Sequence, residues 1–284
     1  MLVSDAGLDG SVAWCVARMG RSAAAVRDNL TPDVWLALSS LERTLRRERA
    51  RRRDEESGLG TVLGRLLEAR HPDTGAPMDA DLVADNLATL LEAGHETTAK
   101  ALTWTLYLLA RAPEWQDRVR AEATAVLPAS GAPASSDIAR LVVTERVIKE
   151  AMRLYPPAPI MARAPSRPIN IGGTTIPTGA QVVVPIFAIH RHTMLWEDPG
   201  RFDPDRFLPE HEKSRPRTQF MPFGAGPRIC IGQGFAMVEA KVLLASFISK
   251  TRFDWDGNHL PEPISRVTLR PRGGMPLRVS PVVD

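Results

Sequence analysis

A glycine-rich stretch built around one cysteine, residues 223–232 (FGAGPRICIG), constrains the possible fold of this chain more than any other part of its sequence. Three glycines in the nine residues from Gly224 to Gly232 allow positive φ angles and close approach of the backbone to another group. Cys230 comes just before a helical pattern at 233–251, where unpaired N–H groups and the helix dipole favour a thiolate. The stretch therefore predicts a thiolate presented at the start of a helix.

A thiolate in this setting suits a heme iron, because it is an axial donor that pushes electron density toward the metal. Arg228, two residues before Cys230, can reach a heme propionate through charge-assisted hydrogen bonds. The alternative interpretation is a glycine-rich turn that holds a buried structural cysteine.

Composition excludes several other classes of protein. The 284 residues are 44% hydrophobic and 24% charged, with a net charge of +3, which is typical of a globular chain. The two cysteines, Cys15 and Cys230, form no CxxC pair, which argues against zinc ribbons and iron–sulfur clusters and favours a reducing, cytoplasmic setting. No membrane span is expected, because no run of about 18 apolar residues occurs. The basic run at 46–53 is followed by acidic residues, so we expect a solvated helix end and no nucleic-acid partner.

Hydrophobic periodicity predicts long helices and a few short strands. The helical patterns cover 11–30, 33–56, 59–70, 79–111, 114–127, 137–154 and 233–251, and the strand patterns cover 169–171, 174–176 and 181–187. The helix at 79–111, with Asp79 as its N-cap and Pro113 after its end, would be about 50 Å long. It is apolar on most sides, as a buried central helix is. These elements predict a mainly α fold with small β-sheets.

Two further patterns are weaker on their own. Glu150 and Arg153 share one face of the helix at 137–154, within an apolar frame that would bury them. The stretch at 93–98 (AGHETT) places a glycine and two threonines in the middle of the helix at 79–111, where they are locally unfavourable. The alternative for this stretch is a buried helix whose threonine hydroxyls bond back to carbonyls.

The stretch at 223–232 resembles the heme-binding motif F-x-x-G-x-R-x-C-x-G of the cytochrome P-450 superfamily at every fixed position. The chain is identified as the C-terminal portion of a bacterial-type member, with residues 1–284 forming a single cytochrome P-450 domain whose fold is N-terminally incomplete. The resemblance implies heme b as the cofactor and Cys230 as its axial iron ligand. It also implies that Arg228 contacts a propionate, and it assigns to the cofactor site Phe223, Gly224, Gly232 and Arg163, the last as another propionate contact.

The same resemblance gives roles to the weaker patterns. Glu150 and Arg153 are expected to form a structural triad with Arg206, which lies in the string at 202–207 (FDPDRF). Glu96 and Thr97 resemble the acid–alcohol pair that delivers protons to oxygen on the distal side of the heme. Trp14 and Arg18 fit the family's W-x-x-x-R pattern, but they lie too near the helix at 79–111 to be that element.

The function implied is hydroxylation of an apolar small molecule, such as a terpenoid or fatty-acyl compound, with O2. Electrons would come from a ferredoxin and its reductase, or from a flavoprotein, as separate partners. Family members are usually longer, so one alternative is a truncated, inactive remnant that exposes apolar surface and does not hold heme stably. A second alternative is a heme-binding sensor module. Glu96 and Thr97 argue against it, because a sensor has no use for proton delivery.

Overall fold

The computed structural model describes residues 62–265 and 267–282. The helices expected at 11–30 and 33–56 therefore lie outside the described residues. The described part falls into two compact units, one ending at His95 and the other beginning at Glu96. We describe each unit by itself.

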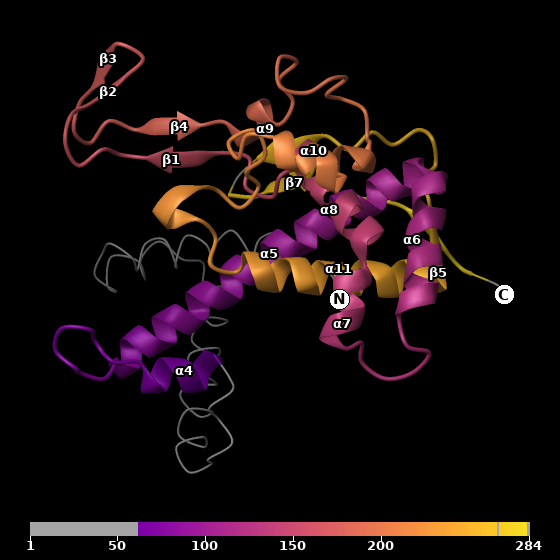
Figure 1. The fold of residues 1–284 in the computed structure, drawn as a ribbon, viewed down its shortest axis with the longest axis horizontal. Coiled ribbons are helices and arrows are strands. Elements are labelled where there is room, and N and C mark those ends of the chain that lie inside the picture. Colours follow the sequence, from indigo (N-terminus) through magenta and orange to yellow (C-terminus); the bar gives the residue numbers. More distant parts are fainter. Residues whose placement is uncertain (1–61, 266, 283–284) are drawn as a thin grey trace. The chain divides into compact units, whose positions relative to one another are not determined.

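Helices dominate the described residues, and every sheet is small, which confirms the expected fold class (Figure 1). The helices are α4 (Val62–Glu68), α5 (Ala80–Arg111), α6 (Pro113–Val126), α7 (Ser135–Arg140), α8 (Val142–Leu154), α9 (Ile186–Ile189), α10 (Pro209–Ser214) and α11 (Gln233–Lys250), with 3-10 turns η2 (Pro204–Phe207) and η3 (Gly226–Arg228). The strands are β1 (Met161–Arg163), β2 (Ile169–Ile171), β3 (Thr174–Ile176), β4 (Val182–Val184), β5 (Thr251–Asp254), β6 (Pro263–Ser265), β7 (Leu269–Pro271) and β8 (Arg278–Pro281). None of the described helices is long and apolar enough to cross a bilayer.

The first unit contains α4 and the beginning of α5. The Asp79 side chain caps α5, since its Oδ1 accepts the N–H of Leu82 at 2.8 Å. This satisfies one of the unpaired donors of the first helical turn and confirms Asp79 as the N-cap. Leu63 and Val83 are buried within this unit.

The sequence predicts a single helix over 137–154, whereas the structure has two helices there, α7 and α8, with a break at Leu141. Leu141 has φ −75° and ψ 65°, outside the helical region. Glu122 of α6 explains why a new helix begins after the break. Its carboxylate accepts the N–H groups of Val143 at 2.6 Å and Thr144 at 2.8 Å. The Thr144 hydroxyl donates to the same carboxylate at 2.7 Å. A side chain from another helix thus satisfies the first donors of α8.

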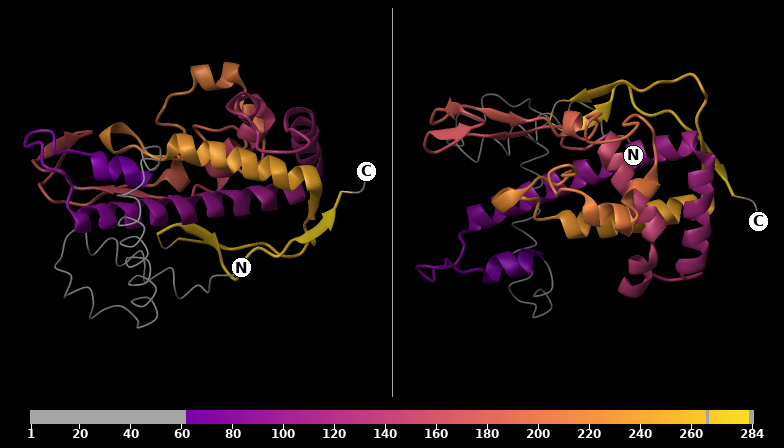
Figure 2. Two further views of the ribbon diagram at one scale, coloured as in Figure 1. Left: turned by 90° about the horizontal axis from the view of Figure 1, so that it is seen from below. Right: turned by 45° about the horizontal axis from the view of Figure 1, so that its top comes forward.

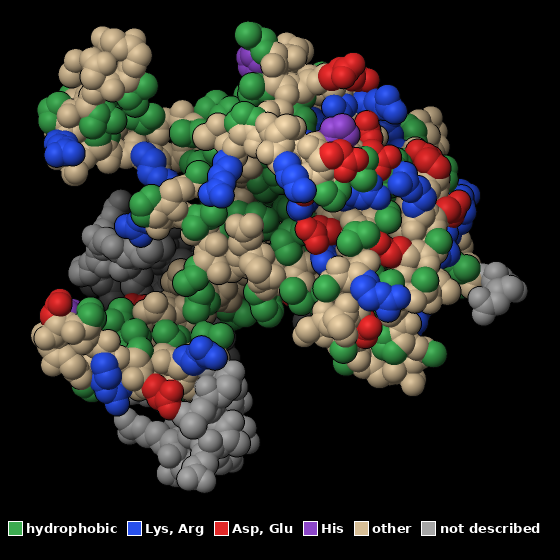
Figure 3. All heavy atoms as spheres, viewed as in Figure 1, with side chains coloured by type: hydrophobic (Ala, Val, Ile, Leu, Met, Phe, Trp, Pro, Cys, Tyr) green, Lys and Arg blue, Asp and Glu red, His purple; other side chains and the backbone are tan. Residues whose placement is uncertain are grey.

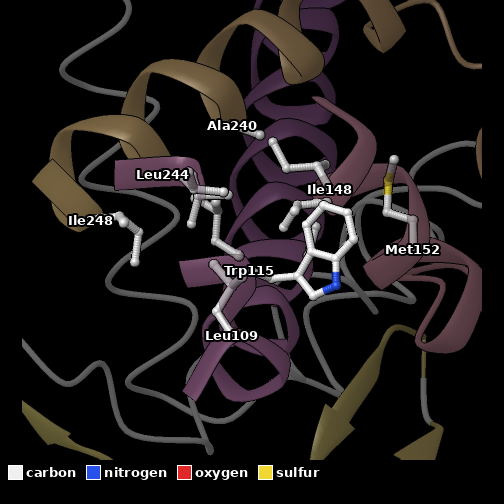
Figure 4. Packing of buried hydrophobic residues seen from close by; sticks show 11 residues of the cluster. Leu109, Trp115, Ile148, Met152, Ala240, Leu244 and Ile248 are labelled. Atoms are coloured by element: carbon white, nitrogen blue, oxygen red, sulfur yellow. The ribbon is translucent and has the colours of Figure 1, made fainter. Parts of the chain in front are cut away.

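The core of the second unit lies where the part of α5 after Glu96 meets α6, α8 and α11. The left view of Figure 2 shows α11 running alongside this part of α5. Figure 4 shows the packing of the main cluster. Its buried members are Ala101, Leu102, Leu109, Trp115, Val119, Val147, Ile148, Met152, Ala240, Leu244 and Ile248. Cys230 therefore lies just before a helix whose later turns are anchored in the core.

The described sheets are antiparallel pairs: β1 with β4, β2 with β3, β5 with β8, and β6 with β7. Strands β2 and β3 occupy the predicted residues, and in Figure 1 their hairpin extends outward from the β1–β4 pair. The strand expected at 181–187 is shorter, because β4 ends at Val184 and Pro185 caps the short helix α9. Proline lacks the N–H that a longer ladder would need.

Two buried polar side chains attach the C-terminal strands to helices. The Gln116 side chain bonds the backbone of Phe253 in both directions, since Nε2 donates to the carbonyl at 2.9 Å and Oε1 accepts the N–H at 2.9 Å. The indole Nε1 of Trp104 donates to the carbonyl of Leu269 at 3.1 Å, and its ring stacks on Tyr155 with centroids 3.9 Å apart. These bonds satisfy polar groups that would be costly to bury alone.

Candidate functional site

The loop that carries Cys230 is closed by its own backbone. The N–H of Cys230 donates to the carbonyl of Phe223 at 2.9 Å, and the N–H of Gly224 donates to the carbonyl of Met221 at 3.0 Å. Between them, Ile229 N–H bonds the carbonyl of Gly226 at 3.1 Å and forms the η3 turn. The cysteine backbone is therefore held at the point where the chain enters α11.

Two of the glycines lie close to other side chains, and only the first has a backbone angle that favours glycine. Gly224 has φ +79°, which favours glycine, and a Cβ added there would lie 3.0 Å from the Met161 Sδ. Gly232 has no such angle, but a Cβ there would lie 3.9 Å from Cys230 Sγ. Glycine at 232 thus leaves open the space beside the sulfur atom.

Cys230 is a free thiol and is exposed, rather than buried as a structural cysteine would be. Ile231, the next residue, and Phe235, in the first turn of α11, are 92% and 73% exposed. Large apolar side chains exposed together usually mark a surface that another group covers. The surroundings of the sulfur therefore suit a large apolar ligand.

Two arginines expected at the cofactor are exposed and have no carboxylate partner among the described residues. Arg163, in β1, donates to the adjacent carbonyl of Ala162 at 2.8 Å, and its other contact is with the Met161 sulfur at 4.0 Å. Arg228, at the end of η3, makes no side-chain hydrogen bond or ion pair within 62–265 and 267–282. Guanidinium groups of this kind can bind carboxylates bidentately. A soft sulfur donor, exposed apolar residues and available guanidinium groups fit a heme with its two propionates.

Glu150 and Arg153 form a fully buried pair on α8. All five N–H donors of Arg153 are used: Nε and Nη2 donate to the Glu150 carboxylate at 2.6 and 2.8 Å, and the others reach three backbone carbonyls. These acceptors are His190 at 2.9 Å, Pro199 at 2.8 Å and Arg201 at 3.0 Å. Such a pair is tolerated in the interior because every polar group is satisfied.

Arg206 lies beside this pair, with its Nε 3.6 Å from Glu150 Oε1. The same oxygen accepts the N–H of Asp203 at 2.9 Å, and Arg206 Nη2 donates to the carbonyl of Asp198 at 3.0 Å. Burial raises the pKa of Glu150, while the bonds from Arg153 and Asp203 oppose that rise. The structure thus brings together the three residues expected as a triad.

His190 belongs to this network, although its sequence context gave no reason to select it. It is fully buried, its Nε2 accepts the N–H of Met221 at 3.0 Å, and its carbonyl accepts from Arg153. Trp196 was missed as well: the Arg153 guanidinium lies 5.0 Å from its ring centroid. A histidine and a tryptophan in an irregular, proline-rich stretch carry no periodic signal that could have revealed them.

Glu96 and Thr97 are consecutive on α5, in the same unit as Cys230. Glu96 is 9% exposed, and Lys100, one turn later, places its Nζ 3.9 Å from the carboxylate. A Cβ added at Gly94 would meet no atom of the described chain within 4 Å. Packing among the described residues therefore does not account for that glycine. No hydrogen bond or ion pair within the described ranges joins Glu96 to the Cys230 loop.

Charged groups elsewhere on the second unit pair with one another. On the face seen in Figure 3, acidic and basic side chains are interspersed over α6, α8 and α10. Lys149 bonds Glu145 at 3.0 Å and Glu212 at 3.0 Å, and Lys241 bonds Glu145 at 2.9 Å. These contacts link α8 to α10 and α11 and serve the packing of the helices.

Comparison with known proteins identifies the class. The family model for cytochrome P450 matches residues 36–277, and the chain belongs to this family. Membership of the family implies a heme-iron cofactor. The crystal structure of the cytochrome P450DA heme domain superposes with a TM-score of 0.82 and 30% sequence identity, over 98% of this chain and 60% of that chain.

Curated relatives come from plants, bacteria and animals. A cytokinin hydroxylase of Arabidopsis thaliana is 41% identical over 222 residues, which are 78% of this chain and 43% of that protein. Cyclooctatin synthase of Streptomyces melanosporofaciens is 38% identical, over 80% of this chain and 48% of that protein. Cytochrome P450 4B1 of Homo sapiens is 36% identical, over 84% and 47%. The chain thus spans about half the length of the curated relatives it matches, which agrees with a partial P450 fold.

Proposed function

We propose that this chain provides the heme-thiolate half of a monooxygenase that hydroxylates an apolar small molecule. The observation that carries the proposal is Cys230, a free and exposed thiol held by a closed glycine loop at the start of α11. Exposed apolar residues precede and follow Cys230 in the chain, and Arg228 is available to bind a carboxylate. The names of the Arabidopsis relatives, cytokinin hydroxylases, support hydroxylation of a small molecule.

Each site residue has a proposed part in this activity. Cys230 would ligate the iron of heme b, and Arg228 and Arg163 would bind its propionates, with Phe223, Gly224 and Gly232 shaping the loop. The heme supplies the activation of O2 when it is bound. Glu96 would hold a proton on its carboxyl oxygen, and Thr97 would pass it on through its hydroxyl. Glu150, Arg153 and Arg206 would hold the loop without touching the reacting atoms.

The finer assignments belong to the same proposal. We expect a terpenoid or fatty-acyl substrate, because an apolar pocket is the usual site for such molecules. Electrons would come from a separate ferredoxin with its reductase, or from a flavoprotein. A free thiol at Cys230 is consistent with a reducing, cytoplasmic compartment. The described residues would belong to a single cytochrome P450 domain.

A second candidate is an inactive remnant of such an enzyme. The exposed fractions of Val238 and Phe247, on later turns of α11, favour it, because 46% and 43% exposure leaves apolar side chains on this helix without cover. A remnant of this kind would keep the fold of the second unit and lose heme readily.

The test is the carbon-monoxide difference spectrum of the dithionite-reduced chain after supplementation with heme. We expect a Soret band shifted far to the red, as thiolate ligation produces. Cys230→Ser should abolish this band, whereas Cys15→Ser, which removes the other cysteine, should keep it. A red-shifted band that survives Cys230→Ser would refute the ligand assignment. Absence of any band in the unmodified chain would favour the remnant.

A further inference from the structure

We propose that His190 is a positioning residue for Cys230, because it joins the buried Arg153 to the segment from which the cysteine loop begins. The inference rests on the proposed function, in which Cys230 is the iron ligand. His190 does not touch the cysteine. Its effect would pass through the backbone of residues 221–230.

The imidazole makes the first connection. Nε2 of His190 accepts the N–H of Met221 at 3.0 Å, and the side chain is fully buried. The acceptor nitrogen must be unprotonated, so the neutral ring carries its proton on Nδ1. Within the described residues Nδ1 makes no hydrogen bond of good geometry, although the backbone of Met152 and Arg153 lies close enough to interact with the ring. The Phe220 ring, with its centroid 5.2 Å away, packs against the imidazole.

The main chain of the same residue makes the second connection. The carbonyl of His190 accepts from Nη1 of Arg153 at 2.9 Å, and Arg153 is held by its two bonds to Glu150. One residue therefore bonds the ion pair through its backbone and the loop through its side chain. A displacement of the ion pair would therefore displace the loop, and the reverse, because both bonds lie in the interior.

Two backbone bonds complete the connection to the thiol. The carbonyl of Met221 accepts the N–H of Gly224 at 3.0 Å, and the carbonyl of Phe223 accepts the N–H of Cys230 at 2.9 Å. Loss of the imidazole bond would free the Met221 N–H inside the protein, where an unpaired donor is costly. The segment would then move toward water, and Phe223 would move with it.

A neutral ring is needed for this role. Burial is the main cause that lowers the pKa of His190 to about 4; the positive charges of Arg153 and Arg191 add to it, and the backbone of Met152 and Arg153 opposes it. The ring is therefore neutral near pH 7 and able to accept. A side chain that only fills space would pack equally well and would leave Met221 without a partner.

Amide hydrogen exchange of the full-length, heme-free chain tests the proposal. In His190→Leu, which keeps apolar bulk and removes the acceptor, the amides of Met221 and Cys230 should exchange at least about tenfold faster. The amides of Ile148 and Leu244, in the main core, should change by less than about threefold. His190→Gln, whose amide oxygen can reach the same donor, should restore most of the protection.

Leu141→Ala is the matched control, because Leu141 is fully buried in a separate cluster with Ala123 and Ala245. It should lower protection throughout the second unit without singling out Met221 and Cys230. Equal acceleration of those two amides and of the core amides in His190→Leu would overturn the proposal. If His190→Leu does not fold, His190→Asn replaces it, since its amide is too short to reach Met221. Equal protection in the Asn and Gln variants would then overturn it.

The heme-supplemented chain provides a spectroscopic readout. His190→Leu should lower the share of the thiolate band relative to the band of heme without thiolate, whereas Leu141→Ala should lower both bands together. An unchanged ratio in His190→Leu would also count against the role of His190. If the unmodified chain gives no thiolate band, the proposed function fails. The exchange result still stands as a test of the link between His190 and the loop.

Discussion

Arg153 donates two hydrogen bonds to Glu150, from Nε to Oε2 at 2.6 Å and from Nη2 to Oε1 at 2.8 Å, with both side chains fully buried. The remaining donors of Arg153 reach backbone carbonyls of residues 190–201, an irregular part of the chain. The pair therefore serves mainly as a fixed point on α8 to which that irregular segment is attached.

Arg153→Lys should lower the free energy of unfolding by about 3–5 kcal/mol, because an ammonium group cannot replace the planar donors and leaves buried acceptors unpaired. Urea unfolding followed by circular dichroism would measure the loss. Arg272→Lys is the control, since Arg272 and its partner Glu262 are 63% and 62% exposed. It should change stability by less than about 0.5 kcal/mol. Similar losses in the two variants would contradict the role of Arg153 as a fixed point.

Gly224→Ala should destabilise the protein more than Gly179→Ala. Both glycines have positive φ, +79° and +77°, so both variants carry a backbone cost of about 1–2 kcal/mol. Only at 224 would the new Cβ meet another atom, the Met161 Sδ at 3.0 Å. Thermal unfolding of both variants, alone and with Met161→Ala, separates the two effects. We expect Met161→Ala to remove the additional stability that Gly224→Ala loses relative to Gly179→Ala. If that difference stays unchanged, the contact with β1 is unimportant.

The stability of the chain should fall as the pH drops from about 6.5 to 4, in part because of His190. Its pKa is about 4 in the folded protein and 6.5 in the unfolded chain, so the unfolded chain binds the proton preferentially in this window. The loss reaches about 3 kcal/mol below pH 4 and is absent above pH 6.5. Urea unfolding of the parent and of His190→Gln across this range would show it. The difference between their unfolding free energies should change with pH, and a constant difference would refute the assignment.

Glu122→Ala should destabilise α8 by about 1–3 kcal/mol, because two N–H groups and a hydroxyl lose their acceptor. Hydrogen exchange should accelerate at Val143 and Thr144 first. Glu114→Ala, an exposed acidic residue at the start of α6, is the control on the same helix. Exchange at Val143 that does not respond to Glu122→Ala would mean that another group caps α8.

The parts of the fold that depend on local chemistry could be predicted from the sequence. Asp79 begins α5 because its side chain accepts from the first turn, and Pro113 opens α6. The strands at 169–171 and 174–176 follow from the glycine turn between them, where Gly172 and Gly173 have positive φ. The spacing of Glu150 and Arg153 was enough to predict a shared helical face.

The remaining features depend on contacts between distant segments. The break at Leu141 arises because Glu122 of α6 caps α8, and β1 forms because it pairs with β4. The burial of His190 depends on how residues 190–201 wrap around Arg153. Periodicity cannot reveal such contacts, because no repeat of residues accompanies them. The roles of the site residues stay predictions that the experiments above address.

The hydrogen bond from Trp104 to Leu269 has a consequence for the folding of this protein during its synthesis. The two residues are 165 positions apart, and Gln116 lies 137 positions from its partner Phe253. At a synthesis rate of about 5–20 residues per second, roughly 10–30 s pass between the emergence of Trp104 and that of Leu269. Throughout that interval the indole N–H lacks its final acceptor, although its stacking partner Tyr155 emerges earlier. Chaperones that shield apolar segments during translation would therefore raise the yield of folded protein.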